Sequence, residues 1–193
     1  MHTGFFPGEL PSRLASAVSR WWFGLRVSWR VADKEPWILA FVLAVMGAIF
    51  FFALKVTYKY QDERRDVLCL ARNVYFEARG EPVAGQYAVA EVTMNRRNSG
   101  RFPGTVCGVV YQKNWDPLRG RYVGAFSWTE FDTLPQPTGV QWLLAWEVAE
   151  DVYYGRAAPV LDRAMYFHAV YIKPDWAKTK RRLARIGGHV FYR

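Results

Sequence analysis

The chain has 193 residues, of which 51% are apolar and 17% are aromatic, so it can hold one ordinary domain and additional segments. The absence of internal repeats and low-complexity segments argues against a repeat protein. The formal net charge of +9 favours an anionic partner, such as nucleic acid, phospholipid headgroups or an acidic polymer, and does not choose among them.

Residues 1–36 form a basic N-terminal segment that is too short for a hydrophobic core. Its apolar residues would lie on one face of a helix, and its arginines largely on the other; the apolar set is Leu14, Val18, Trp21, Trp22, Leu25 and Trp29. This pattern predicts an amphipathic helix in a membrane interface. A disordered basic tail remains an alternative.

Residues 37–54, "WILAFVLAVMGAIFFFAL", contain no charged side chain and have Lys34 before them and Lys55 after them. About 18–20 such residues cross a bilayer core of roughly 30 Å. A buried helix in a globular core would show a polar face, and this segment has none. We therefore expect the segment Trp37–Leu54 to be a single transmembrane helix. The basic residues on its two sides are nearly balanced and favour a cytoplasmic N-terminus only slightly.

Residues 55–65 are predicted to be a linker, and residues 66–193 one compact α+β domain. Apolar residues at helical spacing predict helices over 62–80, 83–97 and 138–155. Short apolar and aromatic runs over 163–171 and 187–193 predict strands. The intervening stretch 114–139 contains turn formers and aromatics and is expected to be irregular, with short strands.

Two glutamates, Glu77 and Glu81, lie near the end of the first of these helices in "NVYFEARGEP". Glu77 falls at the edge of the apolar stripe, beside Leu70, where partial desolvation would raise the pKa of a carboxyl group and suit it to general acid catalysis. Glu81 comes after the expected end of the helix, where its carboxylate could cap the N-terminus of the next helix or accept hydrogen bonds there. Solvated surface carboxylates are the alternative for both residues.

The sequence offers little support for metal, cofactor or nucleophile chemistry. The histidines His2, His168 and His189 lack the close ligand spacing of a zinc site, and no G-x-S-x-G or P-loop motif is present. We predict no metal, no cofactor and no nucleic-acid partner. His168 and His189 are expected on strand faces, as hydrogen-bonded or substrate-contacting groups.

Aromatic side chains of a kind that stacks on sugar rings are frequent after the span: Trp115, Tyr122, Phe126, Trp128 and Trp176. We expect them to be exposed beside one rigid carboxyl. Most glycosidases need two carboxylates. A lytic transglycosylase can use one, because the 6-hydroxyl of muramic acid attacks C1 in place of water. The two cysteines, Cys69 and Cys107, both follow the span and could be free thiols or a disulfide.

Six blocks from Asp66 to Arg193 resemble, in order, the SleB/CwlJ-type cell wall hydrolases, the spore-cortex-lytic group and its relatives. The blocks are "CLARNVYFEARGEP", "GQYAVAEVTMNRR", "FPGTVCGVVYQ", "FSW", "YFHAVYIKPDWA" and "IGGHVFYR". The resemblance implies a lysozyme-like, lytic-transglycosylase-type α+β domain that acts on peptidoglycan, with Glu77 as the catalytic residue.

The resemblance also implies roles for other residues. Those expected near the glycan are Glu81, Ser127, Trp128, Tyr166 and His168. Cys69 and Cys107 match two of the family's cysteines, which favours a disulfide and an exported domain. In relatives the stretch 124–130 often contains "CQFS" and a further Cys, whereas here "GAFSWTEF" has neither. A cross-link is therefore missing there, and greater mobility of that loop is expected.

Together these observations predict an enzyme in the bacterial inner membrane, with its catalytic domain facing the periplasm and the cell wall. Its expected partners are peptidoglycan glycan strands, the lipid bilayer and a possible envelope protein complex. A muramidase that uses water is one alternative. A non-catalytic peptidoglycan-binding or scaffold subunit of an envelope complex is another.

Overall fold

A computed structural model of the protein describes residues 19–24, 26–27, 34–117, 119–161 and 163–193. By its contacts the chain divides into two compact units, Met1–Lys55 and Val56–Arg193. In the first unit, residues 19–24 and 26–27 are helical, and the Trp21 and Trp22 side chains are exposed. The rest of the predicted amphipathic segment lies outside the described residues, so its placement in a membrane interface stays a prediction.

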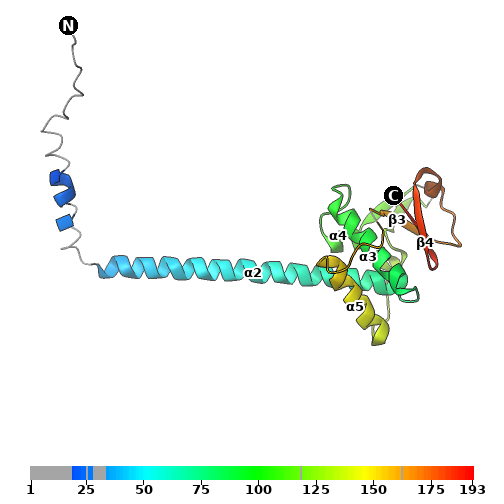
Figure 1. The fold of residues 1–193 in the computed structure, drawn as a ribbon, viewed down its shortest axis with the longest axis horizontal. Coiled ribbons are helices and arrows are strands. Elements are labelled where there is room, and N and C mark those ends of the chain that lie inside the picture. The colour runs from blue at the N-terminus through cyan, green and yellow to red at the C-terminus, as the bar shows by residue number, and fades with distance from the viewer. Residues whose placement is uncertain (1–18, 25, 28–33, 118, 162) are drawn as a thin grey trace, which may run out of the picture. The chain divides into compact units, whose positions relative to one another are not determined.

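The longest element is helix α2, Glu35–Ala78, which has 44 residues (Figure 1). The sequence suggested a membrane helix, a linker and a domain helix in this region, but residues 55–65 are helical too. They contain neither proline nor glycine, and pairs one turn apart join Lys59 to Glu63 and Arg65 to Asp62. The linker is therefore a part of the helix, and the proposed domain boundaries stay predictions.

In the part of the chain that the structure describes, α2 is the one helix long and apolar enough to cross a membrane. The side chains of residues 37–54 are exposed to the surroundings of the chain. The helix therefore agrees with the predicted membrane span in length and composition. Its insertion in a bilayer stays a prediction.

In the second unit, the last turns of α2 form the centre of a helical core. Helices α3 (Val83–Asn98), α4 (Val106–Val110) and α5 (Gly139–Tyr153) gather around them (Figure 1). Pro82 precedes α3, as expected for a residue that fits the start of a helix but not its interior. Leu70 and Val74 of α2 are fully buried in this core.

A disulfide joins Cys69 of α2 to Cys107 of α4. This confirms the pairing that the family resemblance implied, and the alternative of two free thiols is wrong. The bond closes a sequence separation of 38 residues, and such a cross-link stabilises a fold by about 3–4 kcal/mol in the loop-entropy model. It therefore holds the helix that carries Glu77 against the helical core.

Within the described residues, the strands form two antiparallel sheets. The two-stranded sheet is a hairpin of β1 (Lys113–Asp116) and β2 (Arg121–Gly124), followed by the 3-10 helix η1 (Ser127–Glu130). The other sheet has the order β3-β5-β4, with the bounds Tyr166–Ala169, His189–Tyr192 and Arg182–Ile186. Strand β4 was missed because "RRLARI" carries three arginines and gives only a weak apolar signal.

The three-stranded sheet packs on α3 through a smaller core cluster. Phe191 of the central strand β5 is fully buried there with Ala88, Val89 and Val92 of α3. Helices and antiparallel strands are therefore segregated around two adjoining cores, and the α+β class predicted from the sequence is confirmed.

Candidate active site

Glu77 lies in the last turn of α2, at the edge of the buried stripe that contains Leu70, as its helical position predicted. Its side chain is partly buried and lines an open groove with a volume of about 450 Å³. The carboxyl group is thus both fixed by a packed helix and accessible from the groove.

Segments distant in the sequence form the walls of this groove. Phe76 and Glu77 come from α2, and Arg96 comes from α3. The remaining lining residues belong to the stretch after β2, to β3 and the loop after it, to η2 (Asp175–Thr179) and to β5: Ala125, Phe126, Ser127, Phe167, His168, Ala169, Tyr171, Ile172, Pro174, Trp176 and His189. Among the described lining residues, Glu77 is the one carboxylate.

The Glu77 carboxylate has no hydrogen bond or ion pair to another described residue. Burial raises its pKa from 4.5 to about 7, and the positive charge of Arg96 opposes this rise. A carboxyl with a pKa near 7 is partly protonated at neutral pH and can donate a proton and later accept one. This protonation balance is what a single acid/base residue requires.

Arg96 is the cation that faces Glu77 in the groove. Burial lowers the pKa of its guanidinium from 12.5 to about 10, against the opposing charges of Tyr166 and Glu77, so Arg96 remains cationic near pH 7. Its Nε donates to the carbonyl oxygen of Met165 at 2.8 Å, and its guanidinium lies over the rings of Phe126 and Tyr166. These contacts hold the guanidinium group, which forms no ion pair with the Glu77 carboxylate.

Two of the predicted substrate contacts, Ser127 and His168, line the groove with Glu77. Ser127 is exposed. The Nδ1 atom of His168 lies 2.9 Å from the carbonyl oxygen of Ala169, so in the neutral ring Nδ1 carries the proton and Nε2 accepts from the Tyr192 hydroxyl at 2.9 Å. The imidazole is therefore held in one orientation at the groove wall.

The two other aromatic residues predicted to contact the glycan, Tyr166 and Trp128, lie outside the groove lining. Tyr166 is outside the lining, and its ring packs against Trp176, which does line the groove. Trp128 is only 6% exposed, and its indole Nε1 donates to Asn73 Oδ1 at 2.9 Å. Phe126 is buried as well. The expectation of exposed side chains is wrong for Phe126 and Trp128, because both complete the core beneath the site.

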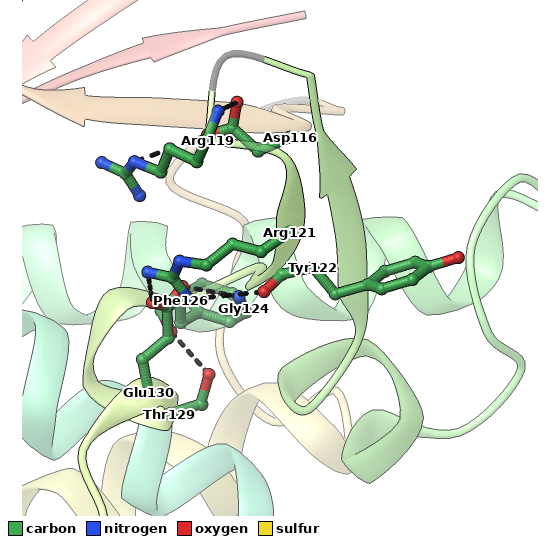
Figure 2. A network of polar contacts seen from close by, with 8 residues as sticks. All are labelled: Asp116, Arg119, Arg121, Tyr122, Gly124, Phe126, Thr129 and Glu130. Carbon is green, nitrogen blue, oxygen red and sulfur yellow. Dashed lines mark hydrogen bonds and ion pairs between the residues drawn. The ribbon is translucent and has the colours of Figure 1, made fainter.

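Trp115 and Tyr122 are exposed, as expected, but they lie on the β1–β2 hairpin and outside the groove lining. Figure 2 shows how the end of this hairpin is fixed: both Arg121 Nη2 and the backbone N–H of Gly124 donate to the Glu130 carboxylate at 2.8 Å. These bonds lower the pKa of Glu130. They connect β2 to η1 and position the intervening groove residues, in a stretch where the missing cysteines had suggested mobility.

Glu81 does not cap α3, so that expectation is wrong. The N-cap residue is Pro82, whose side chain has no acceptor for a capping bond. The Glu81 carboxylate is directed to the β4–β5 turn instead. It accepts from the backbone N–H of Gly188 at 2.7 Å, and its other oxygen lies 3.8 Å from Nδ1 of His189. Glu81 is absent from the groove lining but holds the strand whose His189 is part of it.

Sequence reasoning missed Arg96 as a site residue. Its neighbour Asn95 holds α3 in place by donating to the carbonyl oxygen of Ala164 at 3.1 Å. Both residues belong to the quoted block "GQYAVAEVTMNRR", so the available signal was an arginine in the last turn of the predicted helix. In the described residues, no group of three or more His, Cys, Asp or Glu could hold a metal ion.

A family model described as Cell Wall Hydrolase matches residues 80–192, more than half of the chain. The chain belongs to this cell wall hydrolase family. The matched range begins three residues after Glu77, so the role of Glu77 depends on the geometry described above.

The protein is similar to spore cortex-lytic enzymes. It is 30% identical to that of Oceanobacillus iheyensis over 129 residues, covering 66% of this chain and 41% of the relative. It is 32% identical to that of Bacillus subtilis strain 168 over 130 residues, covering 65% and 37%. The chain thus spans about two fifths of the length of these curated relatives.

A solved structure is similar as well. The catalytic domain of the germination-specific lytic transglycosylase SleB from Bacillus anthracis superposes with a TM-score of 0.50 at 28% identity, and covers 66% of this chain and 93% of that domain. The family and fold that the sequence blocks implied are thereby confirmed.

Proposed function

We propose that the protein is a membrane-anchored lytic transglycosylase that cleaves peptidoglycan glycan strands, with Glu77 as its single general acid and base. One observation carries this proposal: in the described lining of the groove, Glu77 is the one carboxylate, and it is unpaired with a pKa of about 7. A glycosidase that uses water ordinarily places a second carboxylate across the scissile bond. A reaction in which the substrate supplies its own nucleophile needs only one.

In this mechanism the protonated Glu77 first donates its proton to the glycosidic oxygen. The C1–O bond breaks, the leaving sugar departs with a free hydroxyl, and positive charge develops at C1. The 6-hydroxyl of the same muramic acid then attacks C1 and returns its proton to the Glu77 carboxylate. The products are a 1,6-anhydro end and a new free hydroxyl, with no net consumption of water, and Glu77 ends in its starting protonation state.

Other groove residues support the two steps. Arg96 keeps the pKa of Glu77 from rising further, so the carboxylate form needed after the first proton transfer is accessible near neutral pH. The fixed His168 ring, the exposed Ser127 hydroxyl and the partly exposed Trp176 offer hydrogen-bonding and stacking surfaces for sugars. Glu81 is assigned an indirect role, because it acts on the groove through Gly188 and His189.

The experiment that tests this proposal uses the full chain in detergent with purified sacculi, followed by mass analysis of the released fragments. We expect 1,6-anhydromuropeptides from the wild type and none above background from Glu77→Gln. Glu147→Gln, which changes an exposed carboxylate of α5, is the matched control and should retain wild-type release.

Three other results would each point elsewhere. Reducing-end fragments would identify a muramidase, and newly exposed amino groups without glycan cleavage would identify an amidase. No fragments from any variant, with equal retention of wild type and Glu77→Gln on sacculi, would identify a non-catalytic binding or scaffold subunit. Membership in an envelope complex stays a prediction.

Residues 37–54 of α2 are proposed as the membrane anchor, with the domain on the cell-wall side of the inner membrane. The support is the absence of charge in this segment and the exposure of its side chains. The disulfide of the domain also fits an oxidising compartment. A reporter that is active only outside the cytoplasm, fused after Arg193, should give signal, and an inactive fusion with normal expression would reverse the orientation.

A further inference from the structure

A second concave site adjoins the Glu77 groove and shares Phe76 with it. We call it the Arg72 pocket; its volume is about 450 Å³. Its floor is aromatic, since Phe76 stacks on Trp128 with ring centroids 4.8 Å apart and Tyr111 meets Trp128 edge-on at 5.7 Å. Its wall is the segment 131–137, in which two prolines limit the freedom of the backbone. The pocket is therefore formed by packed aromatic side chains and by a segment of restricted backbone freedom.

Two opposite charges, Arg72 and Asp132, also line this pocket. Neither side chain forms an ion pair or a hydrogen bond with another described residue. Arg72 lies one turn before Phe76 on α2 and is partly buried, whereas Asp132 is exposed. A guanidinium in such a place is available for a ligand carboxylate, and the carboxylate of Asp132 for a ligand ammonium.

We propose that the Arg72 pocket binds the stem peptide of peptidoglycan through a side chain that ends in both an ammonium and a carboxylate, as diaminopimelate does. This inference rests on the proposed function, because the stem peptide hangs from the muramic acid of the strand that Glu77 would cleave. Phe76 is common to both sites, so a glycan in the groove brings its peptide substituent to the pocket.

The charges of the pocket predict its selectivity. A zwitterionic end group places its carboxylate on Arg72 and its ammonium on Asp132. A lysine-type side chain offers only the ammonium and leaves Arg72 without a partner. An end group with a carboxylate alone would pair with Arg72 but would be repelled by Asp132. The aromatic floor accommodates the methylene groups of the peptide side chain in either case.

Binding can be measured without turnover, using the full chain carrying Glu77→Gln in detergent. Calorimetric titration with the tripeptide L-Ala-D-Glu-diaminopimelate should show saturable binding, weakened about tenfold or more by Arg72→Gln and by Asp132→Asn. Replacing diaminopimelate by lysine should weaken binding similarly. The controls are Arg182→Gln and Glu147→Gln, two exposed charges outside both sites, which should bind as the parent does.

Cleavage gives a second measurement, in which wild-type protein is offered glycan strands with stem peptides and strands stripped of them. The rate on strands with stem peptides, divided by the rate on stripped strands, should fall about tenfold in Arg72→Gln and remain at the wild-type value in Arg182→Gln.

Absence of tripeptide binding, or equal binding by the parent and both pocket variants, would overturn the stem-peptide site. If Glu77→Gln binds the tripeptide through Arg72 while the wild type cleaves neither kind of strand, the proposed function fails and the pocket stands. Asp132 is exposed, so Asp132→Asn preserves the test if Arg72→Gln fails to fold.

Discussion

Glu77 and Glu81 are four residues apart in one motif, yet the regions around them have opposite character. The end of α2 presents the Glu77 carboxylate to a groove without a hydrogen bond, so burial raises its pKa to about 7. The turn before α3 directs the Glu81 carboxylate to the backbone N–H of Gly188 and toward His189. A carboxylate whose hydrogen bonds are satisfied holds structure together, whereas one that is desolvated and unpaired is ready for proton transfer.

The largest effect expected from this contrast is on glycan cleavage. Glu77→Gln should lower the rate of anhydromuropeptide release by about 10³-fold, because it removes the proposed acid and base, the one carboxylate in the described groove lining. Glu81→Gln should reduce the rate far less, because Glu81 acts through the β4–β5 turn. Rates are to be compared by mass analysis at equal amounts of folded protein. Equal losses in both variants would remove the functional distinction between the two carboxylates.

A second test concerns stability and its dependence on pH. The folded-state pKa of Glu77 is raised from 4.5 to about 7, so the folded protein binds more protons than the unfolded chain between these values. Stability is therefore lost as pH rises through this window, by about 3 kcal/mol when complete. Glu77→Gln should escape this loss and be more stable than wild type at pH 8, with little difference at pH 4.

Urea unfolding of the domain at the two pH values, followed by near-ultraviolet circular dichroism, measures this difference. Glu147→Gln, on the exposed face of α5, should show the pH dependence of the wild type. A destabilised Glu77→Gln at pH 8 would mean that Glu77 makes a stabilising contact and would contradict its assignment as an unpaired acid.

The Glu81 region is expected to respond in the opposite sense. Glu81→Gln weakens a charge-assisted hydrogen bond to Gly188 and should cost about 1–3 kcal/mol of unfolding free energy. Gly187 has φ +55°, and a Cβ atom added there would collide with Glu81 Oε2, so Gly187→Ala should destabilise by about 1–3 kcal/mol.

Thermal or urea unfolding measures both changes. Gly100→Ala is the matched control for the backbone cost, because Gly100 also has a positive φ but has open space around the added Cβ atom. If Gly187→Ala costs no more than Gly100→Ala, the close packing of Glu81 against the turn contributes nothing measurable.

The smallest effect concerns Arg96, whose charge lowers the pKa of Glu77. Arg96→Gln should move the alkaline limb of the pH profile of kcat/KM to higher pH, by up to about one pH unit, because the proton of Glu77 is then held more tightly. Arg96→Lys keeps the charge and should leave the limb closer to its wild-type position. A limb that moves to lower pH would contradict the electrostatic role of Arg96.

Helical periodicity was enough to place Glu77 correctly, because the spacing of Leu70 and Val74 defines which side of α2 is buried. It could not identify the environment of Glu81, whose partner Gly188 is 107 residues away in the sequence. The same limit explains the error at Trp128: an indole in a loop sequence carries no sign that Asn73, 55 residues earlier, accepts its hydrogen bond in the core.

By itself, the sequence determined the uncharged segment of α2, the α+β class and the residue at the helix edge, since these depend on local composition and periodicity, and the resemblance of its motif blocks indicated the family. Only the tertiary structure decided which side chains share the groove with Glu77, that Arg96 faces it without pairing, and that Arg72 and Asp132 meet in one pocket. The physical reason is that burial and charge proximity, which set the pKa and availability of a group, are properties of segments brought together by folding.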